Sequence, residues 1–294
     1  MTLTAPTDRA VLEEACLAAG FDSSGAEPIR LAENAVWRLA GGRVARIARP
    51  GQNDAAAREV EVARWLERSG VPAVRALDVP QPLTVAGGCP ATFWEELPPH
   101  ENGRVADVVH LLKQLHALPK PDLDLGVLNP FVRVAERIDA AVTLSQEDRQ
   151  WLSGRLQDLT TGWADLPTGL PECVVHGDAW VGNVVVTKQG PLLIDFERAS
   201  FGPPEWDLVS TAVKLTTTGA VSEDEYAEFC DTYGTDVTRW AGYELLAGAR
   251  TLRMTTYAAQ HAATHREWQA EAQHRVDCLR GRAGRPPWRW KGIM

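Results

Sequence analysis

The sequence has little of what marks secreted, membrane-spanning or nucleic-acid-binding proteins. Its 5 cysteines are odd in number and widely scattered, without a Cys-x-x-Cys pair, which favours a reduced, cytoplasmic protein. No apolar run approaches the roughly 18 to 20 residues that a membrane-spanning helix needs. Residues 1–6 lack the basic start and apolar core of a secretion signal. A net charge of −9 opposes a nucleic-acid partner, because such a partner needs a basic surface.

Familiar nucleotide-binding and hydrolase motifs are missing as well. The chain contains neither a G-x-G-x-x-G nor a Walker sequence, and it has no nucleophile-elbow serine motif. His261 and His265 have the spacing of two metal ligands on a helix, but the Glu of a His-Glu-x-x-His site is absent. We therefore interpret this pair as chance spacing. The 294 residues suffice for one or two domains with a substantial core.

What is present is concentrated in residues 173–197. Three short apolar runs are separated first by a polar loop and then by a turn at 189–191, and the third run ends on an acid. This pattern predicts strand, loop, strand, turn and strand. Because the last strand returns beside the loop, we expect Asp195 to lie near Asp178 and Asn183.

These three side chains form a ligand set with a recognisable chemistry. Two oxygen ligands, Asn183 and Asp195, and one free carboxylate, Asp178, would converge. Mg²⁺ is a hard cation that takes such ligands and completes its shell with substrate phosphates and waters. In phosphoryl-transfer enzymes a loop Asp accepts the proton of the substrate hydroxyl, while an Asn five residues later and a further Asp hold metal. The sequence has this order and this Asp-to-Asn spacing.

The loop 176–183, with the sequence H-G-D-A-W-V-G-N, resembles the H-G-D-x-x-x-x-N loop of the aminoglycoside phosphotransferase and choline kinase group of small-molecule kinases. Residues 194–197, I-D-F-E, are similar to the metal motif of that group. The resemblance implies that Asp178 is the catalytic base, that Asn183 and Asp195 hold Mg²⁺, and that His176 is structural. The alternative is a hairpin that happens to carry acids, which leaves the register of all four motif residues unexplained.

The resemblance covers about residues 28–257 and extends to the nucleotide site. In the family, a basic residue on the third strand holds the phosphates of the nucleotide and pairs with a Glu on the following helix. The matching positions are Arg46 and Glu59. Arg46 keeps the charge of the Lys that many relatives carry, although its fork geometry differs. Glu61 competes with Glu59, which we prefer because its distance from Trp65 resembles that of the family's helix.

Two further segments are assigned by the same resemblance. Residues 95–99, E-E-L-P-P, resemble the hinge between kinase lobes, whose backbone binds the purine edge, and we place this contact at Glu96 and Leu97. The loop 32–34 matches a loop that lies over the nucleotide phosphates. Backbone contacts leave almost no sequence signature, so these positions depend on the family pattern alone.

We therefore expect an α+β protein with the two-lobed fold of protein kinases. A small N-lobe, residues 1–97, would contain an antiparallel sheet and one helix. A larger, mostly helical C-lobe, residues 98–294, would contain the catalytic loop, the metal site and the acceptor pocket. Helical periodicity favours helices over 54–68 and 131–144, among others. Residues 281–294 show no periodicity, which makes them a tail of unknown order.

The implied reaction moves the γ-phosphoryl of ATP or GTP to a hydroxyl of a small molecule, with Mg²⁺ as cofactor, in a monomer or homodimer. An aminoglycoside or other antibiotic is the leading acceptor, in part because the acid-rich stretch from Glu205 to Glu244 could attract a cation. A metabolite kinase acting on a sugar, an amino alcohol or an amino acid is the alternative. So is a nucleotide-binding pseudokinase that serves as an interaction module. Trp180 either lines the acceptor pocket or packs under the loop, and Asp207 either braces the loop or begins a helix.

Overall fold

The computed structural model describes residues 9–31 and 34–292. Within these ranges the chain forms two compact units. Unit 1 is drawn from residues 1–126 and 176–200, and unit 2 from residues 127–175 and 201–294. These two units do not coincide with the predicted lobes, whose boundary lies after residue 97, and that boundary stays a prediction. Residues 32–33 of the predicted phosphate loop lie outside the described residues.

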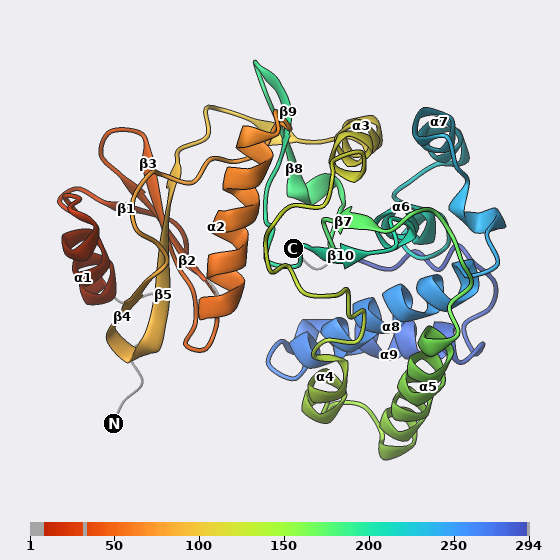
Figure 1. Cartoon of the computed structure of the whole chain (residues 1–294). Coiled ribbons are helices and arrows are strands. Elements are labelled where there is room, and N and C mark those ends of the chain that lie inside the picture. The colour runs from red at the N-terminus through yellow and green to blue at the C-terminus, as the bar shows by residue number, and fades with distance from the viewer. Residues whose placement is uncertain (1–8, 32–33, 293–294) are drawn as a thin grey trace. The chain divides into compact units, whose positions relative to one another are not determined.

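Unit 1 is built on an antiparallel sheet with the strand order β1-β2-β3-β5-β4. One helix covers each face of this sheet (Figure 1). The strands are β1 (Glu27–Leu31), β2 (Ala35–Leu39), β3 (Arg43–Ile47), β4 (Leu83–Val85) and β5 (Cys89–Glu95), and the helices are α1 (Arg9–Ala19) and α2 (Asn53–Arg68). The antiparallel sheet predicted for the N-terminal part is thus confirmed.

The alternation of side chains along β3 separates the core from the site. Ala45 and Ile47 are fully buried and belong, with Phe93 of β5, to the core cluster that includes the apolar face of α1. Complete burial of a side chain such as Ile47 or Phe93 stabilises the fold by about 1.5–3 kcal/mol. Successive residues of a strand face opposite ways, so Arg46 lies on the other face of the sheet, the face that α2 covers.

A second sheet of unit 1 carries the metal motif. It has the order β6-β8-β9, from β6 (Glu101–Asn102), β8 (Val184–Thr187) and β9 (Gly190–Leu193), and is accompanied by α3 (Val105–His116) and a 3₁₀ turn at Val181–Asn183. A further 3₁₀ turn, Ala86–Gly88, joins β4 to β5. The β8–β9 hairpin turns at residues 188–189, slightly earlier than predicted, because Gly190 already pairs with Thr187.

Unit 2 is mostly helical. Its core cluster is made of small and branched apolar side chains from α4, α5, α8 and α9. The predicted helix 131–144 is shorter than expected, because Arg133 adopts a left-handed backbone with φ 63° and Ala141 ends the helix. The elements are α4 (Val134–Ala140), α5 (Gln146–Ala164), β7 (Cys173–Val175), β10 (Ser200–Gly202), α6 (Glu205–Thr216), α7 (Glu223–Tyr233), α8 (Tyr243–Ala262), α9 (Gln269–Leu279) and 3₁₀ turns at Val237–Arg239 and Arg266–Trp268.

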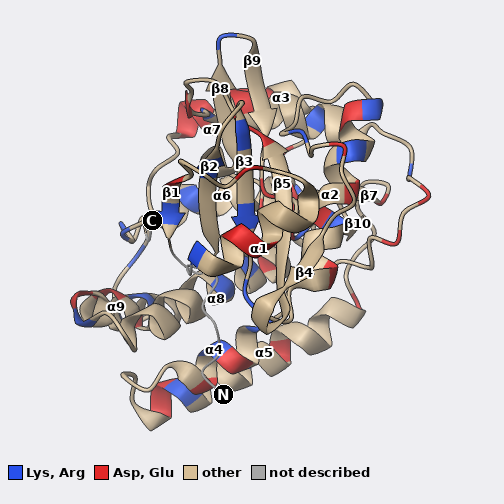
Figure 2. Cartoon of the chain, turned by 90° about the vertical axis from the view of Figure 1, so that its left-hand side faces the viewer, with Lys and Arg blue, Asp and Glu red and all other residues tan. Residues whose placement is uncertain are grey.

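The first turn of α5 ties this helix to the end of α9. Ser145 caps α5 by accepting from the backbone N–H of Asp148. The Asp148 carboxylate pairs with Arg280 at 2.5 Å and with Arg282 at 3.2 Å. Acidic and basic residues are interspersed along α5 (Figure 2), so the helix presents no surface of one sign.

The segment after α9 is fastened to unit 2. The backbone N–H groups of Trp288 and Trp290 donate to the carbonyls of Thr216 and Thr217, at 2.9 and 3.1 Å. Trp290 is buried, its indole N–H points at the Cys278 sulfur, and its ring stacks with that of Trp288. The segment that lacked any periodicity therefore contributes a core residue.

Candidate active site

The loop between β7 and β8 holds Asp178 and Asn183 in a fixed relation. The Nδ2 of Asn183 donates a 2.9 Å hydrogen bond to the backbone carbonyl of Asp178. This bond uses the amide nitrogen of Asn183, so its oxygen, a potential metal ligand, is directed elsewhere. Asn183 is buried at the end of the 3₁₀ turn, whereas Asp178 is half-buried.

His176 and Gly177 fix the conformation of the first part of this loop. The fully buried His176 lies with Nε2 3.0 Å from the carbonyl of Ile194 and Nδ1 3.4 Å from the backbone N–H of Asp178. A neutral ring with the proton on Nε2 satisfies both contacts, which makes His176 a brace between the loop and the metal motif. Gly177 has φ 83°, and a Cβ there would collide with the carbonyl oxygen of Arg198. Only glycine therefore fits this position.

Asp195 lies two residues after β9, in an uncommon backbone conformation. Its φ of 67° lies in the left-handed region, which non-glycine residues rarely adopt and which recurs at functional sites. The backbone N–H of the preceding Ile194 donates to the carbonyl of Asn183 at 3.1 Å, and Val184 pairs with Leu193. These contacts bring the backbone of the metal motif beside Asn183, as the sequence predicted.

The donor set of this site fits a hard divalent cation. The Oδ1 atom of Asp195 is buried and has no hydrogen-bond partner among the described residues, an arrangement that costs free energy unless a ligand is bound. The described residues contain no cluster of three or more His, Cys, Asp or Glu side chains suited to a metal. A site of one carboxylate and one amide oxygen matches Mg²⁺, which draws its remaining ligands from phosphates and water.

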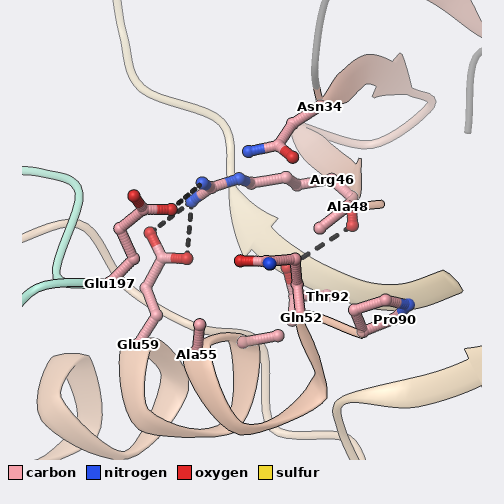
Figure 3. A pocket seen from close by; sticks show the side chains of 10 residues that line it. Asn34, Arg46, Ala48, Gln52, Ala55, Glu59, Pro90, Thr92 and Glu197 are labelled. Carbon is pink, nitrogen blue, oxygen red and sulfur yellow. Dashed lines mark hydrogen bonds and ion pairs between the residues drawn. The ribbon is translucent and has the colours of Figure 1, made fainter. Parts of the chain in front are cut away.

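Arg46 is held by two glutamates. Its Nη1 lies 2.5 Å from both carboxylate oxygens of Glu59 on α2, and its Nη2 lies 3.5 Å from Glu197, two residues after Asp195. Glu61 is exposed on the same helix, so the structure places Glu59 against Arg46. Figure 3 shows both glutamates directed at the guanidinium group.

The electrostatics of this cluster are those of a dense group of carboxylates around one cation. Burial raises the pKa of Glu59 to about 7. Arg46 opposes this rise in pKa, and the nearby carboxylates of Asp195 and Glu197 add to it. Burial disfavours the charge of Arg46, but Glu59, Asp195 and Glu197 outweigh it and raise the pKa of the guanidinium. Glu197, two residues after Asp195, contacts Arg46, so the predicted phosphate-binding and metal-binding residues lie in the same part of unit 1.

A pocket opens beside this cluster, entirely within unit 1. Figure 3 shows its lining, which comes from the sheet, from the first turns of α2 and from the metal-motif loop: Asn34, Arg46, Ala48, Gln52, Ala55, Ala56, Glu59, Pro90, Thr92 and Glu197. Sequence reasoning missed Gln52, Thr92 and Glu197. Thr92 pairs in register with Arg46, so strand alternation could have found it. Glu197 belongs to the motif at residues 194–197, but the sequence analysis assigned it no role.

The predicted hinge follows β5. The backbone N–H of Glu96 donates to the carbonyl of Gly42 at 2.8 Å, and its carboxylate pairs with Arg38 at 2.5 Å. The N–H of Glu96 is therefore engaged within the sheet. Within the described part of the chain, neither the Glu96 carbonyl nor the Leu97 backbone has such a partner. The purine contact placed at Glu96 and Leu97 stays a prediction.

Trp180 packs on its own loop and remains partly exposed. The Trp180 ring lies against Gly182, where a Cβ would collide with it, so this side chain packs on its own loop while 37% of its surface stays exposed.

The acids of the stretch from Glu205 to Glu244 differ in burial. Glu205 and Asp207 are almost completely buried in the first turn of α6. The remaining acids are mostly exposed on α7, where Glu225 serves as the N-terminal cap together with Ser222. The stretch is thus not one continuous surface.

Comparison with known proteins decides the family. The model of the phosphotransferase enzyme family (APH) matches residues 25–246, most of the chain. The chain belongs to this phosphotransferase family. No curated protein matches it by sequence. No helix among the described residues of this family member is long and apolar enough to cross a membrane.

Solved structures share the fold of this phosphotransferase. A choline/ethanolamine kinase family protein from Mesorhizobium loti has a TM-score of 0.66 at 18% identity, with 96% of each chain covered. Aminoglycoside phosphotransferase APH(3'')-Id from Streptomyces rimosus, in complex with ADP and streptomycin, has a TM-score of 0.55 at 20% identity, covering 82% of this chain and 97% of that one. The amicoumacin kinase hAmiN, in complex with AMP-PNP, Ca²⁺ and Ami, has a TM-score of 0.65 at 14% identity, covering 90% and 93%. The expected α+β, kinase-like fold is confirmed.

Proposed function

We propose that the protein transfers the γ-phosphoryl group of a nucleoside triphosphate to a hydroxyl group of a small molecule. The observation that carries this proposal is the joining of Asp178, Asn183 and Asp195 through one loop and one hairpin, with Arg46 in contact with Glu197, two residues after Asp195. The adenine nucleotides bound by two solved relatives support ATP as the co-substrate. A pseudokinase has no need for this complete set of side chains.

Asp178 is the group that accepts a proton. Its carboxylate is half-buried, and the bond from Asn183 to its backbone fixes the position of its Cα. An acceptor hydroxyl placed within hydrogen-bond reach of this carboxylate would lose its proton to Asp178 as the oxygen attacks phosphorus. Such general-base assistance contributes about 10²- to 10⁴-fold to the rate.

The remaining residues position the nucleotide. Asn183 and Asp195 would hold Mg²⁺, which when bound neutralises charge on the phosphate oxygens. Arg46, oriented by Glu59, binds the phosphates through its guanidinium group, and its fixed charge lowers the cost of negative charge developing on them. The Glu96 carbonyl and the Leu97 N–H bind the edge of the purine.

For the acceptor, an aminoglycoside or other antibiotic remains our first candidate. Relatives that share the fold include one solved with streptomycin and one named an amicoumacin kinase. A metabolite kinase acting on an amino alcohol is the second candidate. The choline/ethanolamine kinase relative favours it, because the match covers more of this chain, 96% against 82%, than does the match to the streptomycin complex.

A panel of acceptors tests the proposal. The purified protein is incubated with ATP or GTP, Mg²⁺ and one acceptor at a time, and both nucleotide turnover and phosphorylated product are measured. We expect turnover that depends on a hydroxyl-bearing acceptor and disappears in Asp178→Asn. Acceptor KM measured against ionic strength separates the two candidates, since high salt screens the several charges of a polycation, whereas an amino alcohol has a single positive charge and is affected less. Nucleotide KM measured alongside is the control. Absence of acceptor-dependent turnover across the panel would contradict the proposal.

A further inference from the structure

The two glutamates on Arg46 are bound to it unequally. Glu59 places both oxygens at 2.5 Å from Nη1, and only 6% of its side chain is exposed. Glu197 reaches Nη2 with a single oxygen at 3.5 Å, and 32% of its side chain is exposed. Short bidentate contacts of a buried carboxylate are strong, whereas a long contact of a half-exposed one is weak. One partner of Arg46 is therefore fixed and the other is loosely held.

Glu197 also pairs with a second basic side chain. Its other oxygen lies 3.4 Å from the Nε of Arg198, and 25% of the Arg198 side chain is exposed. If Glu197 leaves Arg46, its charge stays compensated by Arg198. The free energy needed to release it is accordingly small.

A phosphate that binds Nη2 of Arg46 would compete with Glu197 for this nitrogen. Nη1 of Arg46 is taken by Glu59, and the carboxylates of Glu59, Asp195 and Glu197 all act on the one guanidinium charge. A phosphate at Nη2 would add another anionic group beside Glu59, Asp195 and Glu197, against the positive charge of Arg46 and of Arg198, which pairs with Glu197. Figure 3 shows the Glu197 carboxylate beside the end of the Arg46 side chain, on the rim of the pocket.

We propose that Glu197 is the exchangeable counter-ion of Arg46: it holds Nη2 in the nucleotide-free protein and moves to Arg198 when a nucleotide phosphate takes its place. This inference rests on the proposed function, because it takes the pocket beside Arg46 as the phosphate site. It gives the two glutamates opposite effects. Glu59 orients Arg46 for the phosphate, and Glu197 competes with the phosphate.

Binding of metal-free polyphosphate tests this directly. Titration calorimetry with inorganic tripolyphosphate and with ATP, both in excess EDTA at low ionic strength, gives Kd without any contribution from bound metal. We expect Glu197→Gln to lower Kd about two- to fivefold, the range for release of one exposed ion pair. Glu59→Gln should raise Kd by at least about tenfold, because Arg46 loses its buried partner. Glu61→Gln removes one charge from the exposed face of α2 and should leave Kd within about twofold.

A shorter acid separates direct contact from long-range repulsion. Glu197→Asp keeps the charge but withdraws it by one methylene, so a competitor acting by contact should be weakened and Kd should fall below that of the unmodified protein. Two results would contradict the proposed exchange of Glu197 while leaving the kinase function standing, provided that the protein turns over nucleotide. One is a Kd for Glu197→Asp equal to that of the unmodified protein. The other is a Kd for Glu197→Gln that is raised, as expected for Glu59→Gln. If the unmodified protein neither binds these ligands nor turns over nucleotide, the proposed function fails with it. Thermal unfolding of each variant identifies any Kd change that comes from loss of fold.

Discussion

The side-chain amide of Asn183 donates a 2.9 Å hydrogen bond to the backbone carbonyl of Asp178, five residues earlier in the chain. The proposed base and a proposed metal ligand are therefore held by the same short loop. Any change in the Asn183 side chain would disturb both. Changes confined to the Asp178 carboxylate should affect only proton transfer.

Asp178→Asn should abolish most turnover and leave nucleotide binding intact. The variant keeps the shape of the side chain and the backbone carbonyl that Asn183 contacts, but it cannot accept a proton. Loss of a general base lowers kcat by about 10²- to 10⁴-fold. Steady-state kinetics together with nucleotide Kd by calorimetry measures the two effects separately. A kcat close to that of the unmodified protein would exclude Asp178 as the base.

Asp195→Asn should remove the dependence of nucleotide binding on Mg²⁺. Asn tolerates the left-handed backbone at this position, so the variant tests the charge rather than the conformation. Calorimetric titrations of nucleotide at increasing Mg²⁺ should show an affinity that no longer rises with the metal. Asp195→Ala should give the same result with an added loss of stability. Unchanged Mg²⁺ dependence would place the metal elsewhere.

Gly177→Ala should destabilise unit 1 more than an alanine at another left-handed glycine. A Cβ at Gly177 meets the carbonyl oxygen of Arg198, whereas Gly88, with the similar φ of 77°, has nothing within 4 Å of that position. The left-handed backbone costs about 1–2 kcal/mol in both variants. The collision adds to this cost only at Gly177. Denaturant unfolding of the two variants yields the difference, and equal losses would show that the loop accommodates the methyl group.

Trp290→Ala should destabilise unit 2 strongly. The side chain is 3% exposed, and removal of a buried Trp costs about 3–5 kcal/mol. Trp288→Ala is the matched control, because Trp288 is only partly buried and is the ring that stacks on Trp290. We expect a clearly smaller loss for the control in urea unfolding. Similar losses would mean that the stack, rather than burial, holds the segment.

Asp148 should make stability sensitive to acid. Burial acts to raise its pKa, but hydrogen bonds from Gln273, Arg280 and Ser145 outweigh burial and hold the pKa below its ordinary value. A carboxyl group with a lowered folded-state pKa stabilises the fold above its unfolded pKa, and this contribution is lost as the pH falls. The free energy of unfolding should therefore decrease below about pH 5 less steeply in Asp148→Asn than in the unmodified protein. Parallel pH profiles would contradict this assignment.

Sequence reasoning reached the parts of the site that depend on local spacing. The five-residue interval from Asp178 to Asn183 and the hairpin before Asp195 are short-range features, and the structure forms them from residues close in the chain. The pairing of Arg46 with Glu59 was predicted from the family pattern alone, because it joins a strand to the helix on one face of the sheet, which local spacing does not reveal.

Other features had no sequence signal. Glu197 contacts Arg46 only through the tertiary fold, so nothing in the motif revealed which side chain it would meet. The segment around Trp290 forms no regular element, so periodicity could not detect that it is buried. The shortening of α4 follows from the left-handed Arg133, a position that propensity would not select.

The attachment of residues 288–290 to Thr216 and Thr217 has a consequence for how the protein is made. During synthesis the loop after α6 leaves the ribosome long before its partners exist, so its carbonyls first meet water. Domains generally fold as units while the chain emerges, but the buried position of Trp290 is filled only after translation has passed residue 290. A nascent chain stalled just before that point should still expose the pocket that Trp290 fills.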